Sequence, residues 1–455
     1  MTQLAEMTEK HTQVATAPRV MVLGMGATGA SCARYLARQG LPAVFVDTRN
    51  TPPALAEITT AMPQARCYRG PDLPELPRTV EQLLVSPGTP LDLPLIRTAR
   101  ARGLTVESDI DVFMREARAP VVGITGSNGK STVTAMLAAA MSTAGWRVPA
   151  GGNLGTPALD LLTADADAYA LELSSFQLER SGPLKLAAAA LLNLSPDHLD
   201  SHGDYASYVA AKGRILMACQ QAIINRDDAS LAELLQAGAG VTGFTLGEPG
   251  TGDFGLRIHN GSEYLACGRA LLLPVSDLQL AGRHNIANAL AALALGAAVG
   301  ADLASMLAGL KQFTGLEHRM QVVANRDQVC WVNDSKATNV GAAVASISGI
   351  DGPLVLIAGG DAKAADFSPL AEALRGRRCE LVLIGRDREQ IAAAVGDICP
   401  CHRAEDMQAA VKLAQAIVDP GWTVLLAPAA ASLDMFANYA ERGRAFAAAV
   451  GKLDS

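Results

Sequence analysis

The residues best suited to chemistry form a glycine-rich segment, GSNGKS at 126–131, which follows an apolar run at 121–125. Backbone N–H groups in such a turn, and the N-terminus of a helix that begins directly after it, hold phosphate groups. Lys130 is then placed to reach the β- and γ-phosphates of a nucleotide, and Ser131 to bind Mg²⁺. The spacing departs from the standard phosphate-binding loop, because Ile124 stands six residues before Lys130. The Lys-Ser pair at a helix start still favours nucleotide binding over a turn without a ligand.

A second glycine-rich turn, GMGATG at 24–29, follows an apolar run at 20–23, and Asp47 lies 18 residues beyond Gly29. This spacing is typical of a dinucleotide-binding fingerprint, in which the turn takes the pyrophosphate and the acidic residue takes a ribose. Taken alone, the pattern favours NAD. One such motif is weak evidence, however, and an acidic residue after a second strand also suits other ribosyl groups or uracil.

Three further side chains lie where strands are expected to end or where a helix packs beside them. Glu172 interrupts an apolar run at its carboxyl end, where a carboxylate would face Mg²⁺, and a buried charge there seldom serves stability. His198 lies in the loop after the next apolar run, where it suits either a metal ligand or a solvated histidine. Lys212 lies on a predicted helix, on which a solvated lysine is the simplest interpretation.

The last third of the chain carries polar clusters at 318–319, 333–339 and 359–363. The second of these follows an apolar run directly. Loops that follow strands are where ligands are met, although each cluster could also be surface charge.

Strands and helices must position these segments. At three points along the sequence, a new series of elements begins with an apolar strand. Alternating strand and helix patterns predict parallel sheets that are covered on both faces, with ligands at the carboxyl ends of the strands. We therefore expect an α/β fold with a flexible tail over 1–18 and three domains over 19–108, 109–315 and 316–455. The predicted strands are 20–23, 43–46, 121–125, 169–173, 188–194, 222–225, 329–332, 354–358, 381–384 and 423–427. The predicted helices are 31–39, 131–143, 205–217, 286–301 and 303–313.

Composition narrows the functional classes. The chain has 455 residues, of which 49% are hydrophobic and 18% charged, so it is globular and long enough for two to four domains. A net charge of −7 makes nucleic acid an unexpected partner. Residues 1–18 lack the apolar core of a secretory signal, and the longest apolar run, 286–301, is shorter than the ~20 residues of a membrane span. We expect a cytoplasmic protein without membrane insertion.

The eight cysteines are scattered and show no repeated pair with zinc-finger spacing, so reduced thiols are expected. Cys399 and Cys401 are the pair that a redox or metal role could use, but no further His/Cys motif accompanies them.

Taken together, the motifs resemble those of the Mur ligase family over nearly the whole chain. Beside the helix that carries Lys212, the resemblance rests on TGSNGKST (125–132), GGNLG (151–155), ELSSFQLE (172–179), LNLSPDHLD (192–200), GRHN (282–285), EHRM (317–320), NDSKATN (333–339), GGDAK (359–363) and ASLDMFANY (431–439). An ordered set of this kind is far more specific than any single motif. It implies a Rossmann-like N-terminal domain for a UDP moiety, a central P-loop-type ATP-binding domain and a Rossmann-like C-terminal domain that brings an amino acid.

The resemblance implies an ADP-forming carbon–nitrogen ligase of peptidoglycan precursor synthesis. ATP would phosphorylate the carboxylate of UDP-N-acetylmuramoyl-L-alanine, and the amine of D-glutamate would attack the resulting acyl phosphate. The segments 172–179 and 431–439 favour D-glutamate as the amino acid. The expected cofactors are ATP and Mg²⁺, with two ions and with Mn²⁺ as an alternative, and the expected partners are these small molecules, bound by a monomer.

The same resemblance distributes roles over the chain. Catalytic roles fall to Lys130, Glu172, His198, Lys212 and His318. ATP binding falls to Gly126, Ser127, Asn128, Gly129, Lys130, Ser131, Thr132, Asn285, Arg319 and Asp334. Binding of the UDP substrate falls to Gly26, Ala27, Thr28, Asp47, Thr48, Arg49, Gly88 and Asn153. D-Glutamate binding falls to Ser174, Lys336, Thr338, Lys363, Ser432 and Tyr439. Metal binding falls to Ser131, Glu172, His198 and a carbamylated Lys212.

The expected carbamate has a physical reason, because an ammonium group beside Mg²⁺ would be repelled whereas a carbamate offers an anionic oxygen. Two alternatives stay open at this point. A sister Mur ligase would use the same chemistry on L-alanine or a diamino acid, whereas folate-type ligases share the ATP chemistry but lack a UDP-binding N-terminal domain. From a different class, the turn at 24–29 predicts an NAD-dependent dehydrogenase.

Overall fold

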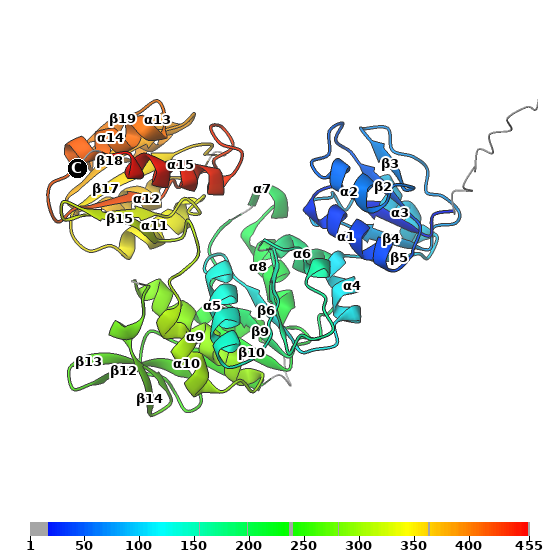
Figure 1. The fold of residues 1–455 in the computed structure, drawn as a ribbon, viewed down its shortest axis with the longest axis horizontal. Coiled ribbons are helices and arrows are strands. Elements are labelled where there is room, and N and C mark those ends of the chain that lie inside the picture. The colour runs from blue at the N-terminus through cyan, green and yellow to red at the C-terminus, as the bar shows by residue number, and fades with distance from the viewer. Residues whose placement is uncertain are drawn as a thin grey trace, which may run out of the picture. The chain divides into compact units, whose positions relative to one another are not determined.

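The computed structural model describes residues 17–153, 155–197, 199–235, 240–280, 282–362 and 365–453. Two predicted site residues, His198 and Lys363, lie outside these ranges. The described residues form two compact units, one running to Val121 and taking in Pro149–Lys185, and the other comprising Val122–Val148 and the residues from Leu186 onward. Each unit is built from α/β elements, as expected (Figure 1).

The first unit contains a parallel sheet with the strand order β3-β2-β1-β4-β5. Its strands are β1 (Val20–Leu23), β2 (Ala43–Asp47), β3 (Arg66–Arg69), β4 (Gln82–Val85) and β5 (Thr105–Glu107), and its helices include α1 (Ala27–Arg38), α2 (Leu55–Ala61) and α3 (Pro94–Ala101). From β1 the chain adds β2 and β3 on one side of the sheet and then returns to add β4 and β5 on the other side of β1, so the strand order reverses between β1 and β4. In such sheets ligands bind beyond the carboxyl ends of the strands at that reversal.

Helix α1 begins four residues before the predicted helix at 31–39. Gly26 is its N-cap residue, so the turn after β1 leads into the helix without a connecting loop. A Cβ atom on Gly29 would lie 2.1 Å from the carbonyl oxygen of Gly24, so only glycine allows this close approach of helix to turn.

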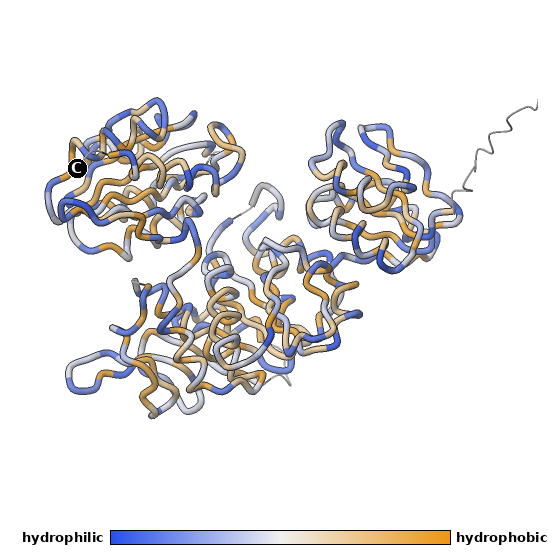
Figure 2. Tube along the Cα trace, in the orientation of Figure 1, coloured by the Kyte–Doolittle hydropathy of each residue, from blue (hydrophilic) through white to orange (hydrophobic). Residues whose placement is uncertain are grey.

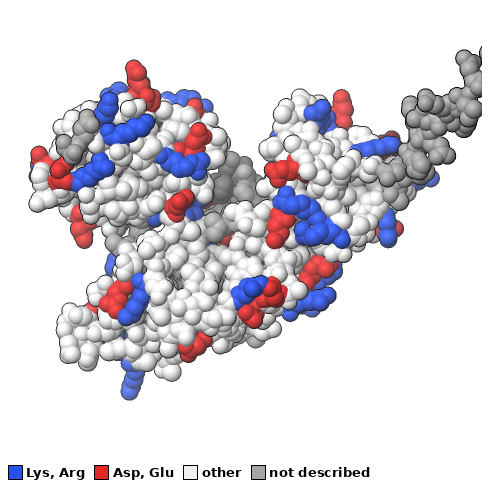
Figure 3. Space-filling model, in the orientation of Figure 1, with Lys and Arg blue, Asp and Glu red and all other residues white. Residues whose placement is uncertain are grey.

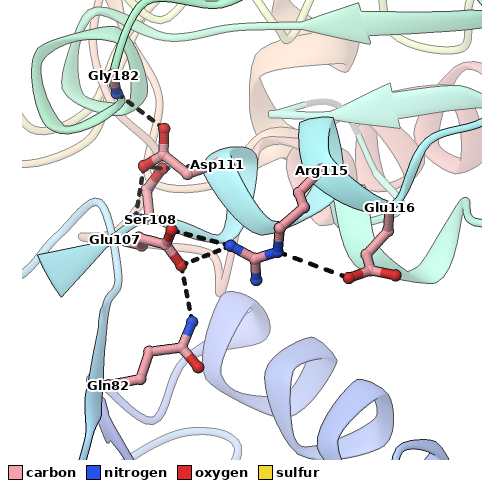
Figure 4. A network of polar contacts seen from close by, with 7 residues as sticks. All are labelled: Gln82, Glu107, Ser108, Asp111, Arg115, Glu116 and Gly182. Atoms are coloured by element: carbon pink, nitrogen blue, oxygen red, sulfur yellow. Dashed lines mark hydrogen bonds and ion pairs between the residues drawn. The ribbon is translucent and has the colours of Figure 1, made fainter. Parts of the chain in front are cut away.

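A polar network ties the end of this sheet to helix α4 (Asp109–Glu116), at the predicted boundary near residue 108 (Figure 4). Ser108 and Asp111 form a capping box at the start of the helix, and the other Asp111 oxygen accepts from the Gly182 amide at 2.8 Å. Glu107 pairs with Arg115 at 2.9 Å. The contact with Gly182 joins the segment Pro149–Lys185 to the rest of the first unit. This segment holds the parallel pair β7 (Ala150–Gly152) and β8 (Tyr169–Glu172), the 3₁₀ turn Ala158–Asp160 and helix α6 (Ser175–Arg180).

The second unit begins with four neighbouring parallel strands in the order β11-β10-β9-β6. They are β6 (Val121–Thr125), β9 (Ala188–Leu191), β10 (Gln221–Asn225) and β11 (Gly240–Phe244), and they continue into β12 (Phe254–His259), β13 (Ser262–Cys267) and β14 (Ala270–Pro274). The sequence did not predict this last part, because its antiparallel strands are half exposed and carry residues such as Arg257 and Glu263 instead of apolar runs.

The helices of this part are α5 (Lys130–Thr143), α7 (Leu199–His202), α8 (Tyr205–Gly213), α9 (Arg283–Ala298) and α10 (Leu303–Gln312), with short 3₁₀ turns at Arg214–Leu216, Ala229–Leu234 and Val275–Asp277. Helix α9 is buried along most of its length, as predicted for the apolar run 286–301. The predicted helix 205–217 was too long, because the α-helix ends at Gly213 and continues only as a 3₁₀ turn.

The C-terminal part holds a sheet with the strand order β15-β16-β20-β17-β18-β19. Its strands are β15 (Gln321–Arg326), β16 (Val329–Asn333), β17 (Leu354–Gly359), β18 (Cys379–Ile384), β19 (Cys401–Arg403) and β20 (Thr423–Leu426), and only β15 pairs antiparallel. Alternate residues of the strands pack on opposite faces, on α11 (Val340–Ser348), α12 (Ser368–Leu374) and α13 (Arg388–Val395) on one side and on α14 (Met407–Ile417) and α15 (Tyr439–Gly451) on the other. Figure 2 shows the strands of this sheet as largely hydrophobic.

Acidic and basic side chains are interspersed on the face drawn in Figure 3. None of the helices within the described ranges combines the length and the apolar character that spanning a bilayer requires. The eight cysteines are free thiols, and Cys401 Sγ lies 3.5 Å from the carbonyl oxygen of Cys399. Among the described residues, no group of three or more His, Cys, Asp and Glu side chains is placed to hold a metal ion.

Candidate functional site

A cavity of about 590 Å³ lies at the carboxyl ends of β1, β2 and β4, within the first unit. All eight residues predicted to bind the UDP substrate line it: Gly26, Ala27, Thr28, Asp47, Thr48, Arg49, Gly88 and Asn153. Polar groups are added to the lining by three residues that were not predicted from the sequence, Ser86, Thr89 and Gln177. Ser86 and Thr89 could have been found from the sequence, because they flank Pro87-Gly88 directly after β4, beside the reversal in strand order.

Both carboxylate oxygens of Asp47 are engaged in supporting the turn of this cavity. Oδ2 accepts from the Met25 amide at 2.7 Å and from Arg49 Nη2 at 2.7 Å, while Oδ1 accepts from the Arg49 amide at 2.9 Å and from Arg49 Nε at 2.8 Å. Burial alone would raise the pKa of Asp47, but the hydrogen bonds from Arg49 and Met25 outweigh it and lower the pKa to about 2. The carboxylate therefore joins β2 to the glycine-rich turn after β1.

This network predicts a pH-dependent effect of Asp47→Asn. A carboxylate whose pKa is lower in the folded than in the unfolded chain stabilises the fold above pH ~4 and loses that effect as the pH falls towards 2. We expect the variant to unfold more easily by about 1–2 kcal/mol at pH 7, because an amide N–H would oppose the Met25 N–H or the guanidinium. Urea denaturation at pH 7 and pH 3 should show a smaller difference at pH 3. Glu81→Gln, which alters an exposed pair with Arg19, is the control, and a difference for Asp47→Asn that is equal at both pH values would contradict the assignment.

The glycine-rich loop after β6 leads into α5 as predicted. Gly129 is the N-cap residue with φ +84° and has no side chain with which to cap the helix. A Cβ atom at this position would lie 2.6 Å from Asn288 Oδ1, so glycine is required for both conformation and space. An N-terminus without a side-chain cap presents backbone N–H groups, which fits a phosphate group. Lys130 Nζ donates to the carbonyl oxygens of Gly126 and Ser127, both at 2.9 Å.

The segment that follows β9 supports this loop. Asn193 accepts from the Asn128 amide at 2.8 Å through its side chain and from the Ser127 amide at 3.0 Å through its carbonyl. The Ser195 amide donates to Ser127 Oγ at 2.9 Å, and the Tyr208 hydroxyl lies 2.9 Å from the same oxygen. The predicted strand 188–194 ends at Leu191 because the next residues turn aside to make these contacts. Asn193 and Ser195 belong to the segment 192–200, but no role was predicted for either of them.

Lys212 is buried, with 2% of its surface exposed, so the interpretation as a solvated lysine is wrong. Its Nζ donates to the carbonyl oxygen of Gly126 at 2.8 Å and lies 4.8 Å from the centre of the Tyr208 ring. Lys130 Nζ uses the same carbonyl. Two ammonium groups that share one acceptor repel each other, which fits a modification that removes the charge of one of them.

Glu172 ends β8 and is 2% exposed. Asn153 Nδ2 donates to its Oε1 at 2.7 Å, whereas Oε2 has no hydrogen-bond partner among the described residues. A buried carboxylate oxygen without a protein donor fits a ligand of Mg²⁺, which prefers such hard oxygens. Glu172 belongs to the first unit and the glycine-rich loop to the second. Ser174, predicted to bind D-glutamate, caps α6 with Gln177.

One predicted ATP-binding residue from the C-terminal part, Arg319, contacts the glycine-rich loop and the helix start that follows it. Arg319 Nη2 donates to Ser131 Oγ at 2.6 Å, across 188 residues of sequence. Asp334 is buried, where it accepts from the Met320 amide at 3.3 Å and from the Ser346 hydroxyl. Burial raises the pKa of Asp334, and the Ser346 hydrogen bond and the Arg319 charge only partly offset this. On α9, Asn285 is buried and its Oδ1 lies 3.4 Å from Asn288 Nδ2.

Three of the residues predicted for the amino acid and its amine lie together. Lys336 Nζ lies 4.1 Å from the centre of the Tyr439 ring, and the Lys336 amide donates to the His318 carbonyl at 3.1 Å. The rings of His318 and Tyr439 meet edge to face at 6.5 Å. The Thr338 amide contacts the Lys336 carbonyl at 2.7 Å. Ser432 is buried in the loop after β20, beside the Asp361–Ala431 bridge that ties this loop to the end of β17.

Arg442 on α15 holds these loops together, and nothing in the sequence pattern singled it out. It is 1% exposed, and its guanidinium donates to Ser335 Oγ at 3.0 Å, to the Ser335 carbonyl at 2.9 Å and to the Ala430 carbonyl at 3.1 Å. Burial lowers the pKa of Arg442 to about 10, against a smaller opposing effect of Asp434. The side chain thereby joins the loops after β16 and β20.

Comparisons with known proteins find three family models that match successive segments of the chain. Family models match as the Mur ligase MurD-like N-terminal domain over 18–108, the Mur ligase middle domain over 124–296 and the Mur ligase glutamate ligase domain over 318–430. A "UDP-N-acetylmuramoylalanine--D-glutamate ligase" of Pseudomonas syringae pv. syringae is 49% identical over 436 residues, which cover 94% of this chain and 97% of the relative. The chain belongs to the Mur ligase family.

Other relatives of this Mur ligase carry the same name. One from Pseudomonas aeruginosa is 48% identical, with 95% of this chain and 98% of the relative covered, and one from Nitrosococcus oceani is 48% identical, with 95% and 96% covered. In fold, this Mur ligase is similar to a UDP-N-acetylmuramate-alanine ligase from Thermotoga maritima, with a TM-score of 0.60 at 17% identity and 94% and 98% of the two chains covered.

Membership of the family has general consequences. Mur ligases are ATP-dependent, ADP-forming ligases, so ATP and Mg²⁺ are the general cofactors and small molecules the substrates. Three α/β domains are present, as predicted. The turn at 24–29 belongs to a Mur ligase N-terminal domain, and the alternative of an NAD-dependent dehydrogenase has no support.

Proposed function

We propose that this Mur ligase joins D-glutamate to UDP-N-acetylmuramoyl-L-alanine at the expense of ATP, through an acyl phosphate, in the synthesis of peptidoglycan precursors. The observation that carries the proposal is the similarity of 48–49% over nearly the full length to relatives named as D-glutamate ligases. We propose a cytoplasmic monomer with domains over 19–108, 109–315 and 316–455 behind a tail over 1–18.

The N-terminal cavity would take the UDP moiety of the substrate. Its lining contains the glycine-rich turn after β1, whose backbone amides suit a pyrophosphate, and Gly88 in the turn after β4. Thr28 and Thr48 add hydroxyl groups that suit polar parts of a nucleotide. The Asp47–Arg49 pair supports the turn beneath this group. Ala27, Gly88 and Asn153 complete the predicted set.

The glycine-rich loop would hold the phosphates of ATP. Lys130 is placed to neutralise charge on the phosphoryl group that moves to the substrate carboxylate, and this positioning requires no covalent protein nucleophile. Arg319 donates to Ser131 at the end of the same loop, and this position supports a contact between Arg319 and ATP. Asn285 and Asp334 are predicted to contact ATP as well. The other predicted contacts are Gly126, Ser127, Asn128, Gly129 and Thr132.

Mg²⁺, when bound, neutralises phosphate charge and polarises the acyl oxygen. We propose Ser131 and Glu172 as ligands of one ion and His198 of a second, with Mn²⁺ as an alternative. A carbamylated Lys212 would present an anionic oxygen near these groups. Its burial and its shared acceptor with Lys130 support the loss of its charge.

The C-terminal domain would bring D-glutamate. Lys336 and Lys363 would pair with its carboxylates, supported by hydroxyl groups of Thr338, Ser432 and Ser174, and Tyr439 would contact its carbon chain. The juxtaposition of Lys336, Tyr439 and His318 supports this assignment. His318 would help to orient the incoming amine.

Phosphate release tests the proposal directly. The full chain is incubated with ATP, Mg²⁺ and UDP-N-acetylmuramoyl-L-alanine, and D-glutamate, L-glutamate, L-alanine and meso-diaminopimelate are offered in separate reactions. We expect release above background only with D-glutamate. Phosphate release with another amino acid instead would identify a sister Mur ligase. No phosphate release with any of the four amino acids would contradict the proposal.

A further inference from the structure

His318 has one ring nitrogen that the protein uses and one that it does not. The side chain is buried, with 6% of the residue exposed, and Nδ1 lies 3.0 Å from Asn333 Nδ2. Nε2 is also buried, but it has no hydrogen-bond partner among the described residues. The ring packs closely against α15, because a Cβ atom on Gly443 would lie 2.4 Å from Nδ1. The two nitrogens thus meet different surroundings.

The orientation of the Asn333 amide decides which nitrogen carries the proton. Asn333 ends β16 with no exposed surface, and its Nδ2 donates to the Gly443 carbonyl at 2.9 Å. Its Oδ1 accepts from the Ser335 amide at 3.2 Å. A carbonyl can only accept and an amide N–H can only donate, so both contacts require the NH₂ group to face α15 and His318. The second N–H of Asn333 therefore points at His318 Nδ1, which must accept it.

A neutral imidazole that accepts at Nδ1 carries its proton on Nε2. Protonation of Nδ1 would place two N–H groups against each other, and the amide cannot turn over without losing the contacts to Gly443 and Ser335. The pKa of His318 lies below its ordinary value, chiefly through burial, with Arg444 lowering it and Glu317 opposing the shift. The neutral form thus prevails near pH 7.

We propose that Asn333 is a positioning residue that holds His318 as the neutral Nε2–H tautomer, so that His318 donates a hydrogen bond to an anionic oxygen of the reacting groups and does not act as the base for the incoming amine. The inference rests on the proposed function for the identity of those groups. It deepens that function by assigning His318 a donor role beside Lys336 and Tyr439. The amine must accordingly lose its proton to another acceptor.

The tautomer can be observed without any turnover. The full chain is labelled with ¹⁵N-histidine, and ¹H–¹⁵N correlations over two and three bonds distinguish the Nε2–H, Nδ1–H and doubly protonated rings. The His318 signals are assigned by their loss in His318→Gln. We expect Nε2–H between about pH 6 and 8. A ring protonated on Nδ1 in this range, alone or together with Nε2, would overturn the proposal. This result holds whether or not D-glutamate is the substrate.

Asn333→Asp tests the role of Asn333 itself. A carboxylate of the same shape can only accept, so we expect His318 to move its proton to Nδ1 and to titrate at higher pH. An unchanged tautomer in the variant would show that Asn333 does not set it. Because the carboxylate would also face the Gly443 carbonyl, this variant could fail to fold, and the next comparison does not depend on it.

Substitutions of His318 separate a donor from a base. The amide N–H of His318→Gln can replace Nε2–H as a donor, whereas neither Gln nor Ala can take a proton from the amine. We expect kcat with the accepted amino acid to fall about tenfold or less in His318→Gln and about 10²-fold in His318→Ala. Equal losses in the two variants would overturn the donor role. Inactivity of the wild-type chain with D-glutamate would count against the proposed substrate alone.

Discussion

Lys130→Ala should abolish most turnover while the protein remains folded. Lys130 Nζ is held over the glycine-rich loop by the carbonyl oxygens of Gly126 and Ser127, at the start of α5. Its charge is therefore located where phosphate groups would meet the uncapped helix end. Removing one such stabilising group costs about 10²–10³-fold in kcat. The measurement is ADP formation at saturating substrates, accompanied by circular dichroism and thermal unfolding of the variant.

The control for this variant is Lys311→Ala. Lys311 lies on α10 of the same region, where its exposed side chain pairs with Asp277 at 2.8 Å. Its removal should leave kcat unchanged and alter stability by no more than about 1 kcal/mol. If Lys130→Ala kept more than a tenth of the wild-type kcat, the assignment of this loop to ATP would be wrong. Loss of the folded state in Lys130→Ala would instead indicate a structural role.

Glu172→Gln should separate activity from stability. The buried carboxylate keeps one oxygen on Asn153, and the other has no donor among the described residues. A charge in that position costs free energy unless a cation binds it, so an amide of the same size should leave the unfolding free energy unchanged or raise it by about 1 kcal/mol when Mg²⁺ is chelated. Turnover should fall about 10²-fold, and half-saturation should need more Mg²⁺.

Thermal unfolding in EDTA and Mg²⁺ titration of ADP formation measure the two effects. Glu57→Gln is the matched control, because Glu57 is an exposed carboxylate of the same unit that pairs with Arg34. It should change neither quantity. A strong destabilisation of Glu172→Gln without Mg²⁺ would show that the carboxylate serves the fold and not the metal. An unchanged Mg²⁺ requirement would likewise exclude Glu172 as a ligand.

Much of the fold could be predicted because its signals are local. The strands β1, β2, β6, β17 and β20 appear as short apolar runs, and a glycine-rich or polar turn follows most of them. Burial on both faces of a parallel sheet requires such runs. The carboxyl ends of neighbouring strands share one edge of a sheet, so the residues after them were expected to meet ligands. For the same reason the N-terminal cavity collects all the residues predicted for the UDP substrate.

Predictions failed where the signal is weak or depends on what lies next to an element. The half-exposed strands β12–β14 lack apolar runs and were not predicted. Helix α1 begins early because Gly29 lets it approach the turn, and β9 ends early because Asn193 turns to support the glycine-rich loop. Local periodicity carries no information about such neighbours.

By itself, then, the sequence determined the α/β architecture, the positions of the phosphate-binding turns and, by resemblance, the family. Only the tertiary structure decided that Lys212 is buried on the Gly126 carbonyl, 86 residues away, and that Asn333 binds Gly443, 110 residues away. Only the structure, too, revealed Arg442 as the tie between two loops. Strand and helix patterns arise from the spacing of neighbouring residues, whereas hydrogen-bond partners and protonation states follow from packing between segments that are distant in the chain.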